Sequence, residues 1–319
     1  MSGGYGDGSC ADGYGVCCLF FTTTCSSEAK HNISYIQNPS YPSGYSTTSS
    51  TTCNYYIQKC QEDVCQVRLD FESLVLTDPL RSSTAAGPGA GTCVTDTLNI
   101  VTSSGDSFGP LCGSETDSSQ HLYLDVGTGG SDSVTLTFGT NVGSPTSSSD
   151  RFWSIRVLQI PCWSRYMADT GCRKYLTGIS GTVYSFNWNN VNSPQLLANT
   201  YTVCVRREAG YCKLCWQAAS DTNSFQTDST IATGSAGTSD CTASIARVFI
   251  PDSNIGGDRS IATKDVYCGG ALNPSYLCSV SSNQLVVDFV SPPAPVSGGG
   301  TGDTMRGFKL LFRQIPCNS

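Results

Sequence analysis

Cysteine is the residue type with the widest chemistry in this chain of 319 residues, which contains 18 cysteines but only two histidines, His31 and His121. Cysteines form disulfides, ligate metals or carry redox reactions. A zinc site is disfavoured because the two-residue spacing occurs once, at Cys212 and Cys215, and both histidines lie in the other half of the chain. An even number of dispersed cysteines indicates structural disulfides formed in an oxidising compartment.

The segment Cys212-Lys213-Leu214-Cys215 also has the spacing of a redox motif. Redox motifs of the thioredoxin type place their cysteines at the N-terminus of a helix that follows a strand. This pair lies instead on a predicted strand. We therefore interpret Cys212 and Cys215 as structural cysteines that bond to different partners.

No catalytic motif accompanies the two histidines. The sequence contains no His-Glu-x-x-His, and the glycine-rich residues 87–91 do not precede a helix that could hold a phosphate. The sequence therefore predicts that the protein is not an enzyme. A hydrolase with two carboxylates stays open as the weakest alternative, because pairing in space is invisible in a sequence.

Period-2 alternation of apolar residues indicates that strands position the cysteines. Val67, Leu69 and Phe71 alternate with polar residues, as do Val134 and Leu136, and turn-rich segments separate such runs. No window keeps a helical apolar face. The pattern predicts an all-β, disulfide-rich fold of the sandwich or jelly-roll type. The longest apolar stretches have strand length, so no transmembrane segment is expected.

Composition limits the partners and the location. Charged residues make up 13% of the chain and the net charge is -7, which opposes binding to the phosphates of nucleic acid. Together with the cysteines, this composition predicts a secreted, extracellular protein. Residues 1–9 lack the basic and hydrophobic regions of a signal peptide. We therefore expect a processed, truncated or reconstructed N-terminus.

An internal duplication is visible in the spacing of several motifs. Gln159-Ile160-Pro161-Cys162 recurs as Gln314-Ile315-Pro316-Cys317, each after an alternating strand. One ancestral unit therefore occurs twice. Two further correspondences link Cys93 and Leu111-Cys112-Gly113 to Cys241 and Tyr267-Cys268-Gly269, and the pair Cys60 and Cys65 to the pair Cys204 and Cys212.

The first copy contains the ordered series Cys25, residues 36–45 (Ile-Gln-Asn-Pro-Ser-Tyr-Pro-Ser-Gly-Tyr), Cys53, Cys93 and Leu111-Cys112-Gly113. This series covers the whole copy and resembles the pattern of the CUB domain family. It implies two tandem jelly-roll β-sandwiches of about ten strands each, which generally mediate protein or carbohydrate contacts. By the family's pattern it also implies three disulfides, namely Cys25–Cys53, Cys93–Cys112 and, in the second copy, Cys241–Cys268.

The remaining cysteines extend this pattern and are similar to those of a tandem-CUB group found in arthropod secretomes. Because antiparallel neighbours bring cysteines near a hairpin tip within bonding distance, we expect Cys60–Cys65 and Cys204–Cys212 bridges. We expect Cys10, Cys17 and Cys18, together with Cys162, to staple an N-terminal leader onto the first domain. The pairing of Cys172, Cys215, Cys278 and Cys317 stays open. The predicted domains are a leader (1–24), a first CUB-like domain (25–162) and a divergent second one (163–319).

Many CUB domains bind calcium through three acidic residues, and the resemblance carries over only part of that set. Asp96 matches the middle position. Thr77 stands where a glutamate would be, with Asp78 beside it, and Asn141 stands near the last aspartate. Calcium takes six to eight oxygens including several carboxylates, so the loss of two charges should weaken binding at Asp96 and Asp78. The alternative is that Asp96 caps a turn and that the protein needs no cofactor.

Two surface features complete the set of candidates. Asn32-Ile33-Ser34 is an N-glycosylation sequon, which we expect to be occupied in a secreted protein. The four tryptophans could form a binding patch, although tryptophan in a sandwich is more often in the core. The tryptophans are Trp153, Trp163, Trp188 and Trp216.

These observations support three functions of different kinds. The first is a non-enzymatic extracellular protein whose two disulfide-stapled modules bind a protein or glycan. The second is a structural subunit that self-associates into a polymer or filament, favoured by the low charge content. The third is the hydrolase named above.

Overall fold

The computed structural model shows an all-β chain. It describes all residues except 1–3, 11–14, 48, 81–89, 117–119, 142–150, 190–192, 197–198, 228–234, 237–240, 242–245, 256–261, 270–271, 273–275, 280, 282–283, 290–305 and 318–319. The described residues form 24 strands and no helix, as the alternation predicts. No helix in this part of the chain is therefore a candidate for crossing a membrane.

The chain divides into two compact units. Module 1 comprises Met1–Thr77 and Thr95–Thr170, and module 2 comprises Asp78–Val94 and Gly171–Ser319. The predicted boundary after Cys162 lies a few residues before this division.

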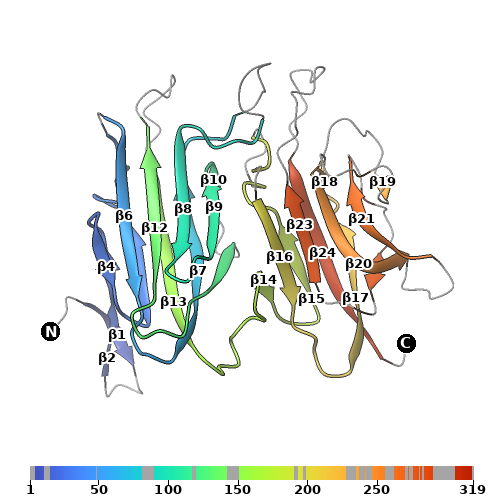
Figure 1. The fold of residues 1–319 in the computed structure, drawn as a ribbon, viewed down its shortest axis with the longest axis horizontal. Helices are drawn as coiled ribbons and strands as arrows, with labels where there is room; N and C mark the ends of the chain where they lie inside the picture. Colours follow the sequence, from blue (N-terminus) through green and yellow to red (C-terminus); the bar gives the residue numbers. More distant parts are fainter. Residues whose placement is uncertain are drawn as a thin grey trace. The chain divides into compact units, whose positions relative to one another are not determined.

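Module 1 is a sandwich of two sheets (Figure 1). One sheet has the order β10-β7-β13-β5-β3, with β11 also pairing with β7, and the other has the order β4-β6-β12-β8-β9. β1 and β2 form a separate antiparallel pair. The strands are β1 (Tyr5–Cys10), β2 (Gly15–Leu19), β3 (Phe21–Thr22), β4 (Ser27–Ala29), β5 (Ile33–Gln37), β6 (Thr51–Gln58), β7 (Val64–Val75), β8 (Asp96–Thr102), β9 (Ser107–Leu111), β10 (Ser114–Glu115), β11 (His121–Asp125), β12 (Ser133–Thr140) and β13 (Phe152–Pro161).

Aromatic residues from both sheets form the core of module 1. Trp153 of β13 stacks on Phe138 of β12 with ring centroids 4.1 Å apart. Tyr55 of β6 packs edge-on against Phe138 and donates a hydrogen bond of 2.9 Å to the carbonyl of Gln37 on the opposite sheet. Burial raises the pKa of Tyr55, so the hydroxyl stays protonated. The alternation predicted from Val134 to Phe138 places these side chains inward.

In module 2, strand pairing connects the eleven described strands into one sheet. Its path is β14-β16-β23-β20-β22-β17-β24-β15, and Trp216 of β17 packs against Phe312 of β24. The strands are β14 (Cys172–Leu176), β15 (Ser180–Tyr184), β16 (Asn199–Val205), β17 (Tyr211–Ala218), β18 (Phe225–Gln226), β19 (Ser235–Ala236), β20 (Arg247–Ile255), β21 (Lys264–Cys268), β22 (Leu277–Ser279), β23 (Gln284–Phe289) and β24 (Gly307–Pro316).

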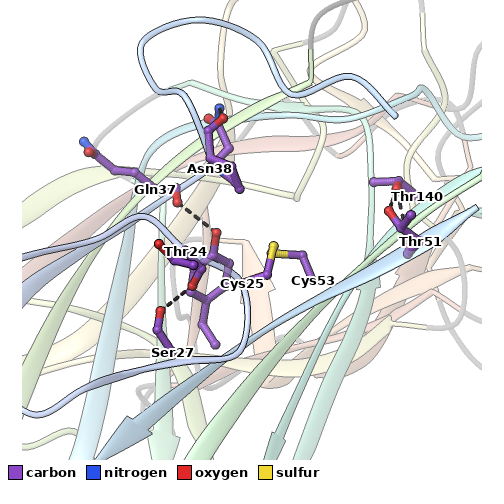
Figure 2. The surroundings of a disulfide bond; sticks show 10 residues. Thr24, Cys25, Ser27, Gln37, Asn38, Thr51, Cys53 and Thr140 are labelled. Carbon is purple, nitrogen blue, oxygen red and sulfur yellow. Dashed lines mark hydrogen bonds between the residues drawn. A yellow bond between two sulfur atoms is a disulfide. The ribbon is translucent and has the colours of Figure 1, made fainter. Parts of the chain in front are cut away.

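Two of the bridges implied by the family resemblance are present. Cys25 bonds to Cys53 of β6, as Figure 2 shows, and Cys241 bonds to Cys268. Cys93 and Cys112 are both disulfide-bonded, as the third implied pair requires.

The two predicted hairpin bridges are wrong. Cys65 bonds to Cys162 and Cys212 bonds to Cys317, while Cys60 forms no disulfide in the described part of the chain. The prediction assumed that consecutive strands are neighbours. β6 and β7 instead belong to different sheets, and β16 and β17 are not adjacent in their path. The chain therefore crosses to the other sheet after β6 and passes to a non-adjacent strand after β16, so neither connection is a hairpin. We call these two connections, residues 59–63 and 206–210, the arches.

The cysteine of each Ile-Pro-Cys repeat joins the last strand of its module to the strand after the arch, because these two strands pair with each other. Pro161 lies opposite Val64, and Pro316 lies opposite Tyr211. The cysteine after each proline then reaches the strand opposite, with Cα–Cα distances of 4.9 and 4.7 Å. The prediction that Cys162 staples the leader is therefore wrong. The side chains of Cys10 and Cys17 lie outside the described residues.

The structure also corrects the alignment of the repeats. Cys204 bonds to Cys172, and the strands β14 and β16 that carry them pair in parallel, as β4 and β6 do beside Cys25–Cys53. Cys204 is thus the equivalent of Cys53 and not of Cys60. Cys215 bonds to Cys278, so Cys212 and Cys215 do bond to different partners, as the sequence predicts.

A buried glutamine stands three residues before the cysteine that ends each repeat, Cys162 or Cys317. Gln159 accepts a hydrogen bond from the Cys60 amide (2.8 Å) and donates to the carbonyls of Gln58 (2.8 Å) and His31 (3.3 Å). In module 2, Gln314 accepts from the amide of Glu208 and donates to the carbonyls of Arg206 and Gly178, at 2.8–3.0 Å. Each glutamine therefore supplies hydrogen-bond partners to backbone groups at or beside the arch. It also donates to the carbonyl of a residue earlier in the same module, His31 or Gly178.

Leader residues join module 1 through β3. Phe21 and Thr22 pair in parallel with β5, the amide of Tyr35 donates to the carbonyl of Phe20, and the Phe20 ring stacks on His31 at 3.5 Å between centroids.

Candidate binding surface

One of the four tryptophans lies outside the core. Trp153, Trp188 and Trp216 are buried, whereas Trp163 is 97% exposed. Trp163 lies in residues 162–168, here called the Trp163 loop, which follow β13. Tyr166 of the same loop is also exposed, at 59%. Tryptophan and tyrosine are enriched at protein interfaces, so this pair of exposed aromatic side chains makes the loop a candidate contact surface.

Both ends of the Trp163 loop are attached to β7. At the start, Cys162 is bonded to Cys65 and its amide donates to the carbonyl of Asp63 (2.7 Å). At the end, the side chain of Gln66 accepts from the Ala168 amide (2.9 Å) and donates to the Ala168 carbonyl (3.0 Å). Gln66 is buried. These attachments restrict the conformation of the loop at both ends.

The backbone of Trp163 is in the left-handed region, with φ of 64°. For a residue with a Cβ this conformation costs about 1–2 kcal/mol, and glycine would avoid the cost. Beside it, the guanidinium of Arg165 lies over the Tyr166 ring at 4.9 Å and donates to the Tyr166 hydroxyl. Strain at an exposed aromatic residue is typical of a site retained for function.

A second candidate surrounds Asp96, where four strand ends of module 1 meet. Its residues are Thr77 after β7, Asp96 at the start of β8, Asn141 after β12 and Arg151 before β13; we call them the strand-end cluster. Asp96 is fully buried. Its carboxylate accepts from the Thr77 amide (2.9 Å) and hydroxyl (2.6 Å) and from Nε of Arg151 (2.7 Å), with the Asn141 amide at 3.4 Å.

The strand-end cluster does not fit calcium. It contains one carboxylate, and a guanidinium already neutralises that carboxylate. The structure describes no group of three or more His, Cys, Asp or Glu that could hold a metal within its placed residues. The predicted calcium role of Asp96 and Asp78 thus lacks a matching donor set. Arg151 was missed because it stands far along the chain from Asp96.

The pKa of Asp96 is shifted downward. Burial alone would raise the pKa, but the hydrogen bonds from Arg151 and Thr77 and the charge of Arg151 outweigh burial. A lowered pKa means that the ionised form stabilises the fold above the pKa of about 3.9 of an unfolded aspartate, and that this stabilisation is lost as pH falls through the folded pKa.

Acid should therefore weaken module 1 through Asp96. We expect Asp96→Asn to be less stable than wild type at pH 7. The difference should shrink as the pH falls below about 3.9, the pKa of an unfolded aspartate, towards the lower pKa of folded Asp96. Urea unfolding between pH 7 and pH 3 measures this. Asp169→Asn, at an exposed position, is the control. A difference that does not change with pH would contradict the role assigned to the Asp96 charge.

The histidines take packing positions in the structure. His31 stacks on Phe20, and His121 is buried on β11 against Tyr123. Arg206, the first of two adjacent arginines, forms an ion pair with Glu208 at 2.8 Å.

Asn32 lies at an exposed position immediately before β5. A glycan on its side chain would therefore extend into solvent. Glycosylation of Asn32 stays a prediction.

Comparisons with known proteins match both halves of the chain. The model of the CUB domain matches residues 25–147, and the model of the animal CUB domain matches residues 169–315. A search of curated proteins gives no match.

Similar solved structures include the CUB1-EGF-CUB2 domains of rat MASP-1, with 15% identity over 90% of this chain and 99% of that chain and a TM-score of 0.28. The full extracellular region of zebrafish Gpr126/Adgrg6 has 16% identity over 93% of this chain and 38% of that chain, with a TM-score of 0.31.

Proposed function

The chain belongs to the CUB family in both halves, and on that premise we propose that it is a non-enzymatic extracellular protein that binds a protein or glycan through the Trp163 loop. CUB domains are typically extracellular protein-interaction modules and are generally not catalytic. The disulfides at both ends of each module suit an oxidising, extracellular environment.

The exposure of Trp163 on an attached loop is the observation that carries this proposal. A large aromatic ring gives much contact area, and it can pack against apolar side chains or against the C–H face of a sugar. Because the loop is held by Cys65 and Gln66, little conformational entropy is lost when a partner binds. Arg165 and Tyr166 add polar groups at the rim of the same surface.

Trp163→Gly should separate binding from stability. Glycine relieves the left-handed strain, so the free energy of unfolding should stay unchanged or rise by up to about 1 kcal/mol. Loss of an anchor worth about 2 kcal/mol or more should weaken partner binding by about 30-fold or more. A glycan array and a pull-down from the native extracellular fluid, each with wild type and variant, measure binding, and thermal unfolding measures stability.

Tyr5→Ala is the matched control, since Tyr5 is another exposed aromatic residue at 69% exposure. It should leave binding intact. If wild type and Trp163→Gly retain the same ligands equally well, the Trp163 loop is not the binding surface.

Self-association is the alternative, favoured by the 13% charged residues. Multi-angle light scattering distinguishes the two functions, because a concentration-independent monomer argues against a polymer subunit.

A further inference from the structure

We propose that the guanidinium of Arg151 serves as a built-in cation at the strand-end cluster, so that this end of module 1 is ordered without calcium. The inference concerns Asp96, Thr77, Asn141 and Arg151 and is independent of the Trp163 loop.

The coordination of Asp96 is the first argument. Oδ2 alone accepts from the Thr77 amide, the Thr77 hydroxyl and Nε of Arg151, at 2.6–2.9 Å. Three donors occupy the lone pairs of this oxygen. A calcium ion would need the same oxygen at 2.3–2.6 Å and would have to displace donors that satisfy a fully buried carboxylate.

Charge is the second argument. Asp96 and Arg151 sum to zero, and the four residues of the cluster contain no other carboxylate. Calcium sites rely on several carboxylates to offset the charge of the ion. Here an entering ion would meet a fixed positive charge, because the Arg151 side chain is only 14% exposed and its Nε lies 2.7 Å from Asp96.

The connections of Arg151 are the third argument, since they are those expected of a bridging cation. Its NH2 group donates to the carbonyl of Asn141 (3.3 Å), while its own carbonyl accepts from the amide of Tyr45 (2.7 Å). The Arg151 guanidinium thus joins the start of β8 to the segment after β12, and the Arg151 backbone carbonyl adds the segment around Tyr45. A guanidinium has several donors in a fixed plane and can make such a junction alone.

Thermal unfolding of the full chain tests this inference in chelator and in calcium at a few millimolar, above the dissociation constants of roughly 10⁻⁴–10⁻³ M of extracellular modules. We expect wild type to show the same midpoint in both. Arg151→Met should lower the midpoint, and Arg151→Lys should lower it less, because lysine keeps the charge but loses the planar donors. Arg207→Met, at an exposed position outside both the strand-end cluster and the Trp163 loop, is the control.

Two results would overturn the proposal. One is a calcium-induced rise of several degrees in the wild-type midpoint that Asp96→Asn abolishes. The other is Arg151→Met with wild-type stability in chelator. A calcium effect that persists unchanged in Asp96→Asn would place the ion elsewhere and would leave the proposal standing. Each readout is separate from ligand binding, so failure here and failure of the Trp163 loop are distinguishable.

Discussion

Gln159→Leu is expected to lower the free energy of unfolding of module 1 by about 3–5 kcal/mol. Leucine has a similar volume, but it leaves the Cys60 amide and the carbonyls of Gln58 and His31 without their partner in a partly buried region. A buried backbone group that loses its hydrogen bond costs about 1–3 kcal/mol. Equilibrium unfolding in urea gives the difference directly.

Because the domain is duplicated, the same substitution can be tested in module 2. Gln314→Leu should have an effect of similar size in module 2, because Gln314 makes the equivalent three hydrogen bonds. Gln61→Leu, at an exposed position of the first arch, is the control and should change stability little. A loss below about 1 kcal/mol in both Gln159→Leu and Gln314→Leu would show that these glutamines do not hold the arches.

Removal of the Cys65–Cys162 bridge is the other change with a large expected effect. The two cysteines are 97 residues apart, and cross-linking a loop of about 100 residues restricts the unfolded chain by up to about 4.7 kcal/mol in the entropic model. We expect the paired change Cys65→Ala with Cys162→Ala to destabilise module 1 by about 2–5 kcal/mol. It should also loosen the Trp163 loop and so weaken partner binding.

Cys60→Ala distinguishes this pairing from the hairpin bridge that the sequence alone suggested. It should leave stability nearly unchanged, because Cys60 forms no disulfide in the described part of the chain. Mass spectrometry of unreduced peptides should recover Cys65 linked to Cys162 and Cys212 linked to Cys317. A peptide that links Cys60 to Cys65 would contradict the pairing of Cys65 with Cys162.

The local sequence pattern was sufficient to predict the strands and the family resemblance. The alternation around Val134 and around Val67 reports which side of a strand is buried, and both segments are strands in the structure. The order of cysteines near Cys25 and Cys53 was enough for the resemblance and for that bridge. The recurrence of Gln-Ile-Pro-Cys also marked Gln159 and Gln314, although their role at the arches was not recognised.

Local sequence patterns could not predict contacts between residues that are distant in the sequence. Spacing suggested that Cys60 and Cys65 meet, but β6 and β7 enter different sheets and Cys65 meets Cys162. Likewise, no local pattern distinguishes exposed Trp163 from buried Trp153, because each burial depends on what packs opposite.

The sequence by itself determined that this protein is a disulfide-rich, duplicated β-protein, because alternation, cysteine number and repeated motifs are properties of short segments. Only the tertiary structure decided which cysteines bond, that Arg151 neutralises Asp96 and that Trp163 faces solvent. The physical reason is that these contacts depend on the order of strands within the sheets, which is set by the packing of the whole module.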